Sequence, residues 1–432
     1  MPGYEDFVDL NHKPRSNELL VSARIKIPAW TTYKRAAGAV AAESSVGTWA
    51  KVKNVNASHV QQVAACVYEM GSDGWIKIAY PLDHFELGNI GQILASIAGN
   101  VFGMKTVSGL RIQDIKWPKM MIKSFPGPQY GISGIRKIFG VKNRPLMLSV
   151  PKPKVGMTVQ EHAKIGYEIW TGGLDLLKDD ENLTNQKFNP FDARARLCFK
   201  LRDKAEKQTG EKKSYLINVS GPSTEEMLRR AKLVADLGGE YVMVDIITCG
   251  WTALRSLREF CSDYHLAIHA HRAFHAAFTR NKSHGFSMLA TAEIARLLGC
   301  DQLHIGTGIG KLVSPIDEVM SIRSHIVNNI VAADPRLHLL SENWQQMKNI
   351  FPVSSGGLHP GLIPQIMDLF GNDVLLQIGG GIHGHPWGSY AGAKAMRSAV
   401  QGVLDKKTLS ESARESPQLR EALRVWGTSR PR

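Results

Sequence analysis

Gly172-Gly173-Leu174-Asp175-Leu176-Leu177-Lys178-Asp179-Asp180-Glu181-Asn182 begins with apolar residues typical of a buried strand and ends with one lysine and three carboxylates. Because side chains alternate along a strand, Lys178 and Asp180 point to the same face, and Glu181 joins them only if the strand ends there. Like charges packed this closely are costly to bury without a cation. The stretch therefore predicts a site for a hard divalent metal with a lysine close by.

Short apolar runs of the same kind recur from about residue 145 onward, and helical patterns such as residues 223–237 and 361–369 separate most of them. Eight such strand–helix units favour an α/β fold with a (β/α)8 TIM barrel, and the alternative is an open, doubly wound sheet. The expected strands are residues 146–152, 173–180, 215–220, 241–248, 266–272, 302–307, 352–357 and 375–380.

The residues before the barrel mix strands and helices. Residues 19–28 and 75–81 read as strands, and residues 31–44 and 89–99 read as helices. This alternation predicts a smaller ferredoxin-like α+β domain. The expected domains are therefore residues 1–127 and the barrel at residues 128–432.

The composition of the chain is that of an ordinary globular protein and argues against membrane-associated and nucleic-acid-binding functions. The chain has 432 residues, of which 43% are hydrophobic and 21% are charged. We expect no membrane association, because there is no apolar run of about 18 residues and no signal-peptide core. Five scattered cysteines favour a cytoplasmic setting. The net charge of +14 is dispersed without a nucleic-acid-binding motif, so we expect no nucleic-acid partner, and it suits a small polyanionic substrate.

The active site of a TIM barrel lies at the carboxyl ends of its strands. Six of the eight expected strands end in chemically useful residues, and only the third and fourth end without an obvious reactive group. The useful ends are Pro151-Lys152-Pro153-Lys154, Lys178-Asp179-Asp180-Glu181, His269-Ala270-His271-Arg272, the run from His304 to Lys311, Ser354-Ser355-Gly356-Gly357, and Gly379-Gly380-Gly381.

The glycine-rich ends of the last two strands predict a phosphate site, since backbone amides approach an anion only where no Cβ intrudes. Arg272, His304 and Ser355 could form a second anion site, and Lys311 could move as a lid. Other readings stay open. His269 taken alone could be structural or catalytic, with the structural reading favoured. The loop at residues 43–49 could be a plain loop, and the histidines at 359, 383 and 385 could serve only to fix loops.

Together these residues carry a resemblance to the large subunit of ribulose-1,5-bisphosphate carboxylase/oxygenase (Rubisco), from about residue 18 to 400. The Val150–Lys154 variant most resembles the archaeal, form III branch. The motifs are Ala41-Ala42-Glu43-Ser44-Ser45 with Gly47-Thr48-Trp49, Gly99-Asn100-Val101-Phe102-Gly103, Lys152-Pro153-Lys154, the opening stretch, His271-Arg272-Ala273, Gly310-Lys311-Leu312, Ser355-Gly356-Gly357, and Gly379-Gly380-Gly381 with Gly384-His385-Pro386-Trp387-Gly388.

The resemblance implies a carbon–carbon lyase that adds CO2, in competition with O2, to ribulose 1,5-bisphosphate and gives two molecules of 3-phosphoglycerate. Lys178 would first react with an activator CO2 to form a carbamate. That carbamate, Asp180 and Glu181 would hold Mg2+. The carbamate would also remove the C3 proton of the sugar.

The resemblance implies further roles for other residues. Lys311, steered by Glu43, would stabilise the new carboxylate. Lys152, supported by Lys154, would protonate the final carbanion, and His271 would contact the C3 hydroxyl. Arg272, His304 and Ser355 would bind one phosphate, and the other would be bound by Thr48, Trp49, Gly356, Gly357, Gly379 and Gly380.

In this family Glu43, Thr48, Trp49 and Asn100 reach the barrel of a neighbouring subunit. The resemblance therefore implies a homodimer with shared sites, and larger rings of dimers occur in such families. The archaeal-type branch usually lacks a small subunit. This chain departs from the family at Val313-Ser314-Pro315, where Glu-Gly is common, so its lid would close differently. The charged tail, residues 405–432, offers no evident latch over that lid.

Two other functions remain alternatives. The first is a Rubisco-like enolase or isomerase acting on a methionine-salvage sugar phosphate, although such relatives typically lose several of the positions named above, all of which are filled here. The second is a metabolite-binding or scaffold protein on the same fold, which would not need Lys178.

Overall fold

The computed structural model describes residues 3–48, 52, 55–309 and 315–429. The chain forms two compact units. The first unit comprises Met1–Gly127, Phe274–Leu297 and Asn328–Met347, and the second unit comprises Pro128–Ala273, Leu298–Val327 and Lys348–Arg432.

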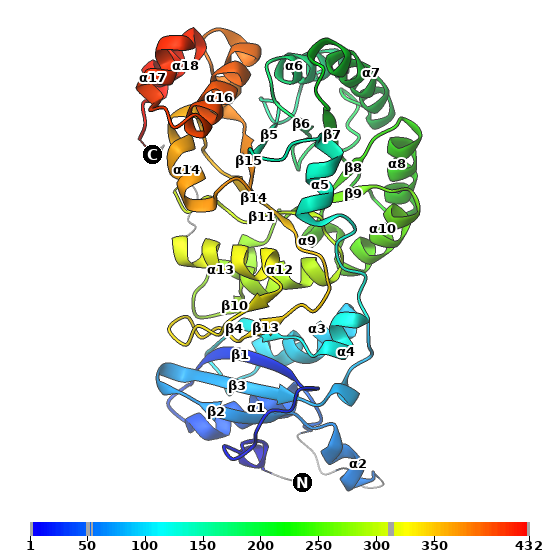
Figure 1. Ribbon diagram of the computed structural model, residues 1–432. Helices are drawn as coiled ribbons and strands as arrows, with labels where there is room; N and C mark the ends of the chain where they lie inside the picture. The colour runs from blue at the N-terminus through cyan, green and yellow to red at the C-terminus, as the bar shows by residue number, and fades with distance from the viewer. Residues whose placement is uncertain (1–2, 49–51, 53–54, 310–314, 430–432) are drawn as a thin grey trace. The chain divides into compact units, whose positions relative to one another are not determined.

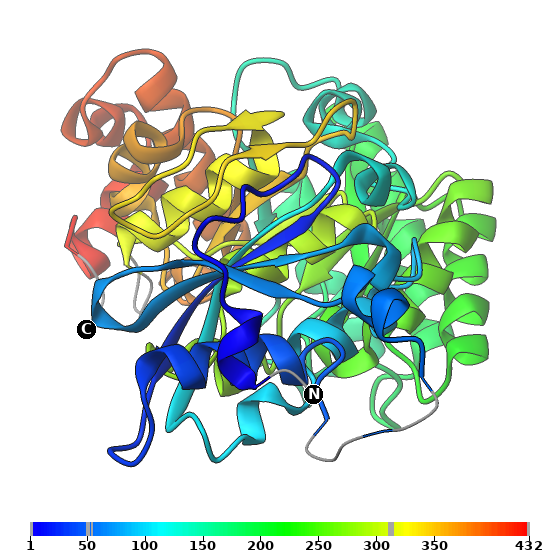
Figure 2. The ribbon, with the colours of Figure 1, turned by 90° about the horizontal axis from the view of Figure 1, so that it is seen from below.

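The first unit is built on a sheet whose strands β2, β3, β1 and β4 are antiparallel neighbours, with β10 added in parallel beside β4 (Figures 1 and 2). Two strand–helix–strand crossings through α1 and α3 give the ferredoxin-like arrangement that the sequence predicted. Its elements are β1 (Leu19–Lys26), α1 (Tyr33–Glu43), α2 (Ala57–Gln62), β2 (Cys66–Met70), β3 (Trp75–Tyr80), α3 (Ile90–Ala98), β4 (Gly109–Lys116), α4 (Lys119–Lys123), α11 (Ala276–Thr279), β10 (Gly285–Phe286), α12 (Met288–Leu297), β12 (Ile330–Val331) and β13 (Glu342–Asn343).

The second unit contains a closed barrel of parallel strands in the order β11-β14-β15-β5-β6-β7-β8-β9. Every one of the predicted barrel strands is present, and each is shorter than predicted. They are β5 (Leu146–Ser149), β6 (Leu176–Lys178), β7 (Ser214–Asn218), β8 (Tyr241–Asp245), β9 (Ala267–His271), β11 (Gln302–His304), β14 (Phe351–Ser355) and β15 (Leu375–Ile378).

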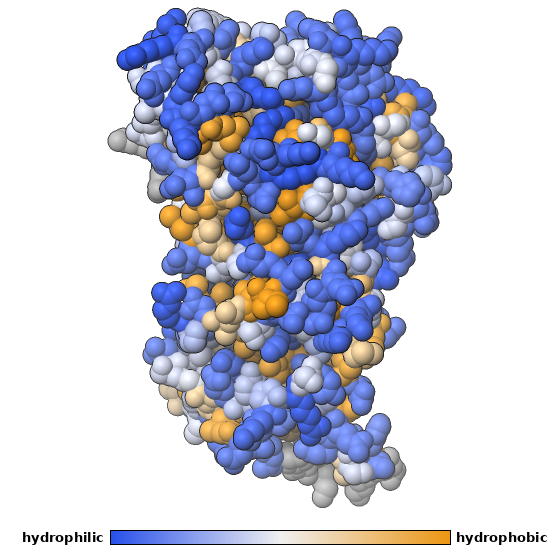
Figure 3. Space-filling model, viewed as in Figure 1, coloured by the Kyte–Doolittle hydropathy of each residue, from blue (hydrophilic) through white to orange (hydrophobic). Residues whose placement is uncertain are grey.

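Helices of the second unit cover the outside of this barrel, and α6, α7, α8 and α10 follow one another around β5 to β9 in Figure 1. The face that carries α17 and α18 is mainly hydrophilic (Figure 3). No described helix is long and apolar enough to cross a membrane. The helices are α5 (Gly131–Phe139), α6 (Val159–Thr171), α7 (Phe191–Thr209), α8 (Thr224–Asp236), α9 (Ile246–Cys249), α10 (Trp251–Asp263), α13 (Ile316–Val327), α14 (Ile363–Phe370), α15 (Gly380–His383), α16 (Gly388–Leu404), α17 (Leu409–Glu415) and α18 (Pro417–Trp426).

The barrel strands are buried on both faces, which explains why the sequence reads as apolar runs rather than as alternation. Leu148, Leu176, Leu216 and Met243 come from four strands and pack in one buried cluster. Because apolar side chains fill the middle of the barrel, the polar side chains of the pocket lie at the ends of the strands.

Buried ion pairs tie the amino ends of neighbouring strands, opposite the predicted site. The carboxylate of Asp175 accepts hydrogen bonds from the Met147 amide at 2.8 Å and from two nitrogens of Arg144 at 2.6 and 2.7 Å. Asp301 likewise accepts from the Ile268 amide at 2.9 Å and from Arg258 at 3.0 Å. Each carboxylate thus joins an arginine to the backbone of the adjacent strand.

Replacing Asp175→Ala leaves the Arg144 guanidinium buried without its carboxylate. We expect this change to destabilise the barrel by about 3–5 kcal/mol, measured as a lower midpoint of urea unfolding. Glu259→Ala is the matched control, because Glu259 pairs with Arg255 on the exposed face of α10. Equal midpoints for the two variants would contradict the assignment.

Candidate active site

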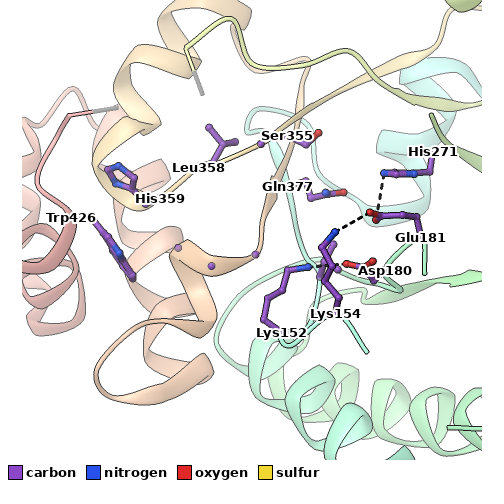
Figure 4. Close-up of a pocket in the computed structure, with 16 residues that line it drawn as sticks. Lys152, Lys154, Asp180, Glu181, His271, Ser355, Leu358, His359, Gln377 and Trp426 are labelled. Carbon is purple, nitrogen blue, oxygen red and sulfur yellow. Dashed lines mark hydrogen bonds and ion pairs between the residues drawn. The ribbon is translucent and has the colours of Figure 1, made fainter. Parts of the chain in front are cut away.

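A pocket of about 400 Å³ opens at the carboxyl ends of the barrel strands in the second unit (Figure 4). Most of its lining comes from the carboxyl ends of β5, β6, β9, β14 and β15 and from the residues that follow these strands. Ten predicted site residues line it: Lys152, Lys154, Asp180, Glu181, His271, Ser355, Gly356, Gly357, Gly379 and Gly380.

The predicted metal ligands gather where β6 ends. Lys178 is fully buried, and its Nζ donates to the Asp179 carbonyl at 2.8 Å. Asp180 Oδ2 accepts from Lys152 Nζ at 2.8 Å, and Glu181 Oε1 accepts from Lys154 Nζ at 3.3 Å (Figure 4). Ammonium groups therefore stand against both carboxylates, so the donor set suits a cation.

Burial and neighbouring charges shift the pKa values of the residues at the end of β6. Burial lowers the pKa of Lys178, although the carboxylates of Glu181, Asp245 and Asp180 act to raise it. Burial alone would raise the pKa of the Glu181 carboxyl group. The positive charges of His271 and Lys178 outweigh burial and hold this pKa well below its usual range. The lowered pKa of Lys178 increases the share of its neutral amine, the form that can react with CO2, beside the low-pKa carboxyl group of Glu181.

Asp179 points away from the pocket and anchors the end of β6. Its carboxylate accepts from Arg194 Nη2 at 3.2 Å, from the Asn218 amide at 3.0 Å and from the Tyr215 hydroxyl. Burial favours the neutral acid, yet Arg194 and His162 lower the pKa of Asp179 to about 2. The alternation predicted from the sequence thus separates a structural carboxylate from the pocket residues on either side.

The expectation that the third and fourth strands end without a reactive group was wrong. Asp245 ends β8, and its Oδ1 lies 3.1 Å from His271 Nδ1. Asn218, at the end of β7, donates to Asp245 Oδ2 at 3.2 Å. Asp245 therefore orients His271, whose Nε2 lies 3.7 Å from Glu181 Oε2. The predicted strand extended to Thr248, so Asp245 was placed inside the strand rather than at its carboxyl end.

A row of buried side chains runs behind the pocket wall. His304 Nε2 lies 2.9 Å from His269 Nε2, and His304 Nδ1 lies 2.8 Å from Ser355 Oγ. Both ring nitrogens of His304 are thus engaged, and Ser355 is the member of the row that lines the pocket. Arg272 is half-buried, and burial lowers its pKa to about 10.

The backbone conformation and close packing of the loops after β14 and β15 require glycine at several positions. Gly357 has a φ of 76°, in the left-handed region. A Cβ on Gly381 would lie 2.3 Å from the Leu358 carbonyl oxygen, so the two loops pack backbone to backbone. A Cβ on Gly379 would lie 3.1 Å from Lys152 Cε, which places the lysine against this wall.

Three of the predicted amino-terminal site residues lie in the first unit. Asn100 Nδ2 donates to Glu43 Oε1 at 3.3 Å, and both side chains are exposed, as is Thr48. The remaining two predicted positions, Trp49 and Lys311, lie outside the described residues, as do Val313 and Ser314.

Four residues that line the pocket were not predicted from the sequence as site residues. Trp426, at the end of α18, lines the pocket together with Leu358, His359 and Gln377 (Figure 4). The Trp426 ring lies 6.1 Å from the His359 ring. No local pattern indicates that a tail residue returns to the loops after β14 and β15.

Family models match both parts of the chain. The model of the ribulose bisphosphate carboxylase large chain catalytic domain matches residues 131–426, and the model of the N-terminal domain of the same chain matches residues 6–121. A protein of Methanocaldococcus jannaschii named ribulose bisphosphate carboxylase is 47% identical over 429 residues, which cover 98% of this chain and 100% of that protein.

Solved structures agree with this result. The dimeric archaeal Rubisco from Hyperthermus butylicus has a TM-score of 0.93 and 43% identity over 99% of this chain and 100% of that chain. The octameric Rubisco from Pyrococcus horikoshii, in complex with sulfate, has a TM-score of 0.93 and 45% identity over 100% of this chain and 98% of that chain. The chain belongs to the ribulose bisphosphate carboxylase large chain family, among archaeal relatives.

Proposed function

We propose that this chain carboxylates ribulose 1,5-bisphosphate to two molecules of 3-phosphoglycerate, with oxygenation as a competing reaction. The observation that carries the proposal is the fully buried Lys178, which interacts electrostatically with Asp180 and Glu181. These two carboxylates line a pocket together with Lys152 and Lys154. The full-length archaeal relatives named ribulose bisphosphate carboxylase support it.

The donor set fits an activator CO2 and Mg2+. The neutral amine of Lys178 can attack CO2 and lose one proton, which leaves a carbamate. Lys178 in this form, with Asp180 and Glu181, would hold Mg2+, which when bound polarises the oxygens of the sugar. Oxygen ligands suit this hard ion, and the ammonium groups now standing against both carboxylates show that the site accommodates positive charge.

The chain's own residues would act around the sugar. Lys152, an ammonium group lying against Gly379, can donate a proton to a carbanion in the pocket, and Lys154 keeps a second positive charge beside it. His271, held by Asp245, would contact the C3 hydroxyl. The phosphates would be bound by Arg272, His304 and Ser355 at one end and by Thr48, Trp49, Gly356, Gly357, Gly379 and Gly380 at the other.

We also propose a homodimer with shared sites, in which Glu43, Thr48, Trp49 and Asn100 of one subunit complete the pocket of the other, and Lys311 closes it. The dimeric and octameric relatives support this assembly, with no small subunit required. The domain division at residues 1–127 and 128–432 is likewise proposed, supported by the separate family-model matches. Free cysteines throughout the described residues support a cytoplasmic setting.

A direct assay tests the reaction. The protein is incubated with Mg2+ and bicarbonate and then given ribulose 1,5-bisphosphate and labelled CO2, and we expect labelled 3-phosphoglycerate. Lys178→Met should abolish the label, whereas Lys213→Met, which removes a buried lysine paired with Glu211, should retain it in the folded protein. Turnover of a diketo sugar phosphate without label would instead favour the enolase or isomerase.

Metal binding can be followed without turnover, using Mn2+ as a paramagnetic probe. We expect the wild-type protein to bind Mn2+ more tightly when CO2 is present, because the carbamate adds an oxygen ligand. In Lys178→Met this CO2 dependence should vanish. CO2-dependent binding that survives in the variant would rule out Lys178 as the reacting amine.

Activation should depend on pH in a defined direction. Only the neutral amine attacks CO2, and burial lowers the pKa of Lys178, so its reactive fraction grows as pH rises through that lowered pKa. The rate of activation, measured by incubation at different pH values and assay at one fixed pH, should therefore increase with pH. A rate that falls with rising pH would contradict this account.

A further inference from the structure

We propose that Gln302 is a positioning residue that fixes the tautomers of His269 and His304, and thereby leaves the Ser355 hydroxyl hydrogen free to donate into the pocket. The inference deepens the proposed function and rests on it only in taking the pocket as the place where a sugar phosphate binds.

The four side chains form one continuous row across β9, β11 and β14. The amide of Gln302 lies 2.8 Å from His269 Nδ1, through the atom assigned as Oε1. The row continues from His269 Nε2 to His304 Nε2 at 2.9 Å, and from His304 Nδ1 to Ser355 Oγ at 2.8 Å. Gln302 and His269 are fully buried, and His304 is 2% exposed, so water does not intervene along the inner part of the row.

The contact between the two rings restricts their protonation. Two ring nitrogens 2.9 Å apart share a single hydrogen, since two N–H groups cannot face each other at that distance. Burial lowers the pKa of His269 and of His304 well below the usual range, so both rings are neutral. Each neutral ring carries one N–H and one acceptor nitrogen. The hydrogen bonds along the row can therefore run in only two directions. The orientation of the Gln302 amide at one end and of the Ser355 hydroxyl at the other end decides between them.

In the first direction the Gln302 oxygen accepts from His269 Nδ1. His304 must then donate through Nε2, and its Nδ1 accepts the hydrogen of the Ser355 hydroxyl. In this state Ser355 turns lone pairs toward the pocket, where the negative oxygens of a sugar phosphate would meet them.

In the second direction the Gln302 NH2 group donates to His269 Nδ1. His269 then donates through Nε2, His304 donates through Nδ1 to Ser355 Oγ, and the serine hydrogen is free to point into the pocket. A donor there suits the anionic substrate, because hydrogen bonds to charged oxygens are the stronger ones.

The amide itself favours the second direction. With Oε1 toward His269, the Gln302 Nε2 atom has no hydrogen-bond partner among the described residues, at a fully buried position. Amide oxygen and nitrogen are assigned from the bonds that they make. Turning the amide pairs one of its two N–H groups with His269 Nδ1, and leaves one N–H and the carbonyl oxygen unpaired in place of two N–H groups. Folded proteins leave carbonyl oxygens unpaired somewhat more often than N–H groups.

Neutron diffraction from crystals of the deuterated protein tests the row directly and needs no activity. We expect deuterium on His269 Nε2 and His304 Nδ1, and none on His304 Nε2. Deuterium on His304 Nε2 would overturn the proposal. Because this readout does not depend on turnover, it decides the inference even if the protein fails to carboxylate ribulose 1,5-bisphosphate, a result that would instead overturn the proposed function.

Kinetics test whether Gln302 acts through Ser355. Gln302→Met keeps the length of the side chain and removes both hydrogen-bonding atoms. We expect a rise of roughly tenfold in KM for the bisphosphate, the scale of one hydrogen bond to a charged group, with a smaller change in kcat.

The same change in a Ser355→Ala background should add nothing to the effect of Ser355→Ala alone, because the hydroxyl that Gln302 orients is gone. Ser354→Ala is the matched control and should leave KM unchanged, since the Ser354 hydroxyl has no hydrogen-bond partner among the described residues. Independent, additive effects of the Gln302 and Ser355 changes would overturn the proposal, as would an unchanged KM in Gln302→Met.

Discussion

The buried pair of Asp179 and Arg194 fixes the geometry on which the site depends. Both side chains are fully buried. The Asn218 amide donates to the same oxygen of Asp179 as Arg194 does, and the Tyr215 hydroxyl donates to the other oxygen. A buried ion pair is weak evidence for stability, but it specifies one arrangement because any other leaves a charge unpaired. Asp179 directly follows β6, and its partners hold it away from the pocket, while the next residue, Asp180, lines the pocket.

The barrel then brings together side chains that are far apart in the sequence. Lys152 follows β5, and His271 and Ser355 end β9 and β14, yet all three line one pocket. Each strand is short and buried on both faces, so its position is fixed by apolar packing, while Asp175 and Asp301 close the opposite end with ion pairs to Arg144 and Arg258. Stability and chemistry are thereby assigned to opposite ends of the same strands.

The sequence allowed the strands and most pocket residues to be predicted, because apolar runs and the groups that end them are local features. What failed depends on boundaries and on distant contacts. The strand expected at residues 241–248 ends three residues earlier, and this alone concealed Asp245 as the partner of His271. His304 contacts His269 and Ser355, which come from β9 and β14, and no local pattern in the sequence indicates these contacts. Trp426 likewise reaches the pocket only through the folding of the tail.

The charges explain why activation by CO2 would precede the metal. Burial lowers the pKa of Lys178, and when its amine is neutral the positive charges of Lys152 and Lys154 balance the negative charges of Asp180 and Glu181. A divalent cation entering this balanced site would meet two ammonium groups and only two carboxylates. In the proposed mechanism, conversion of the Lys178 amine into an anion would add a third oxygen-bearing ligand and a negative charge, which would favour the metal. A bound divalent metal would then leave an excess of positive charge facing the pocket, which would attract a bisphosphate.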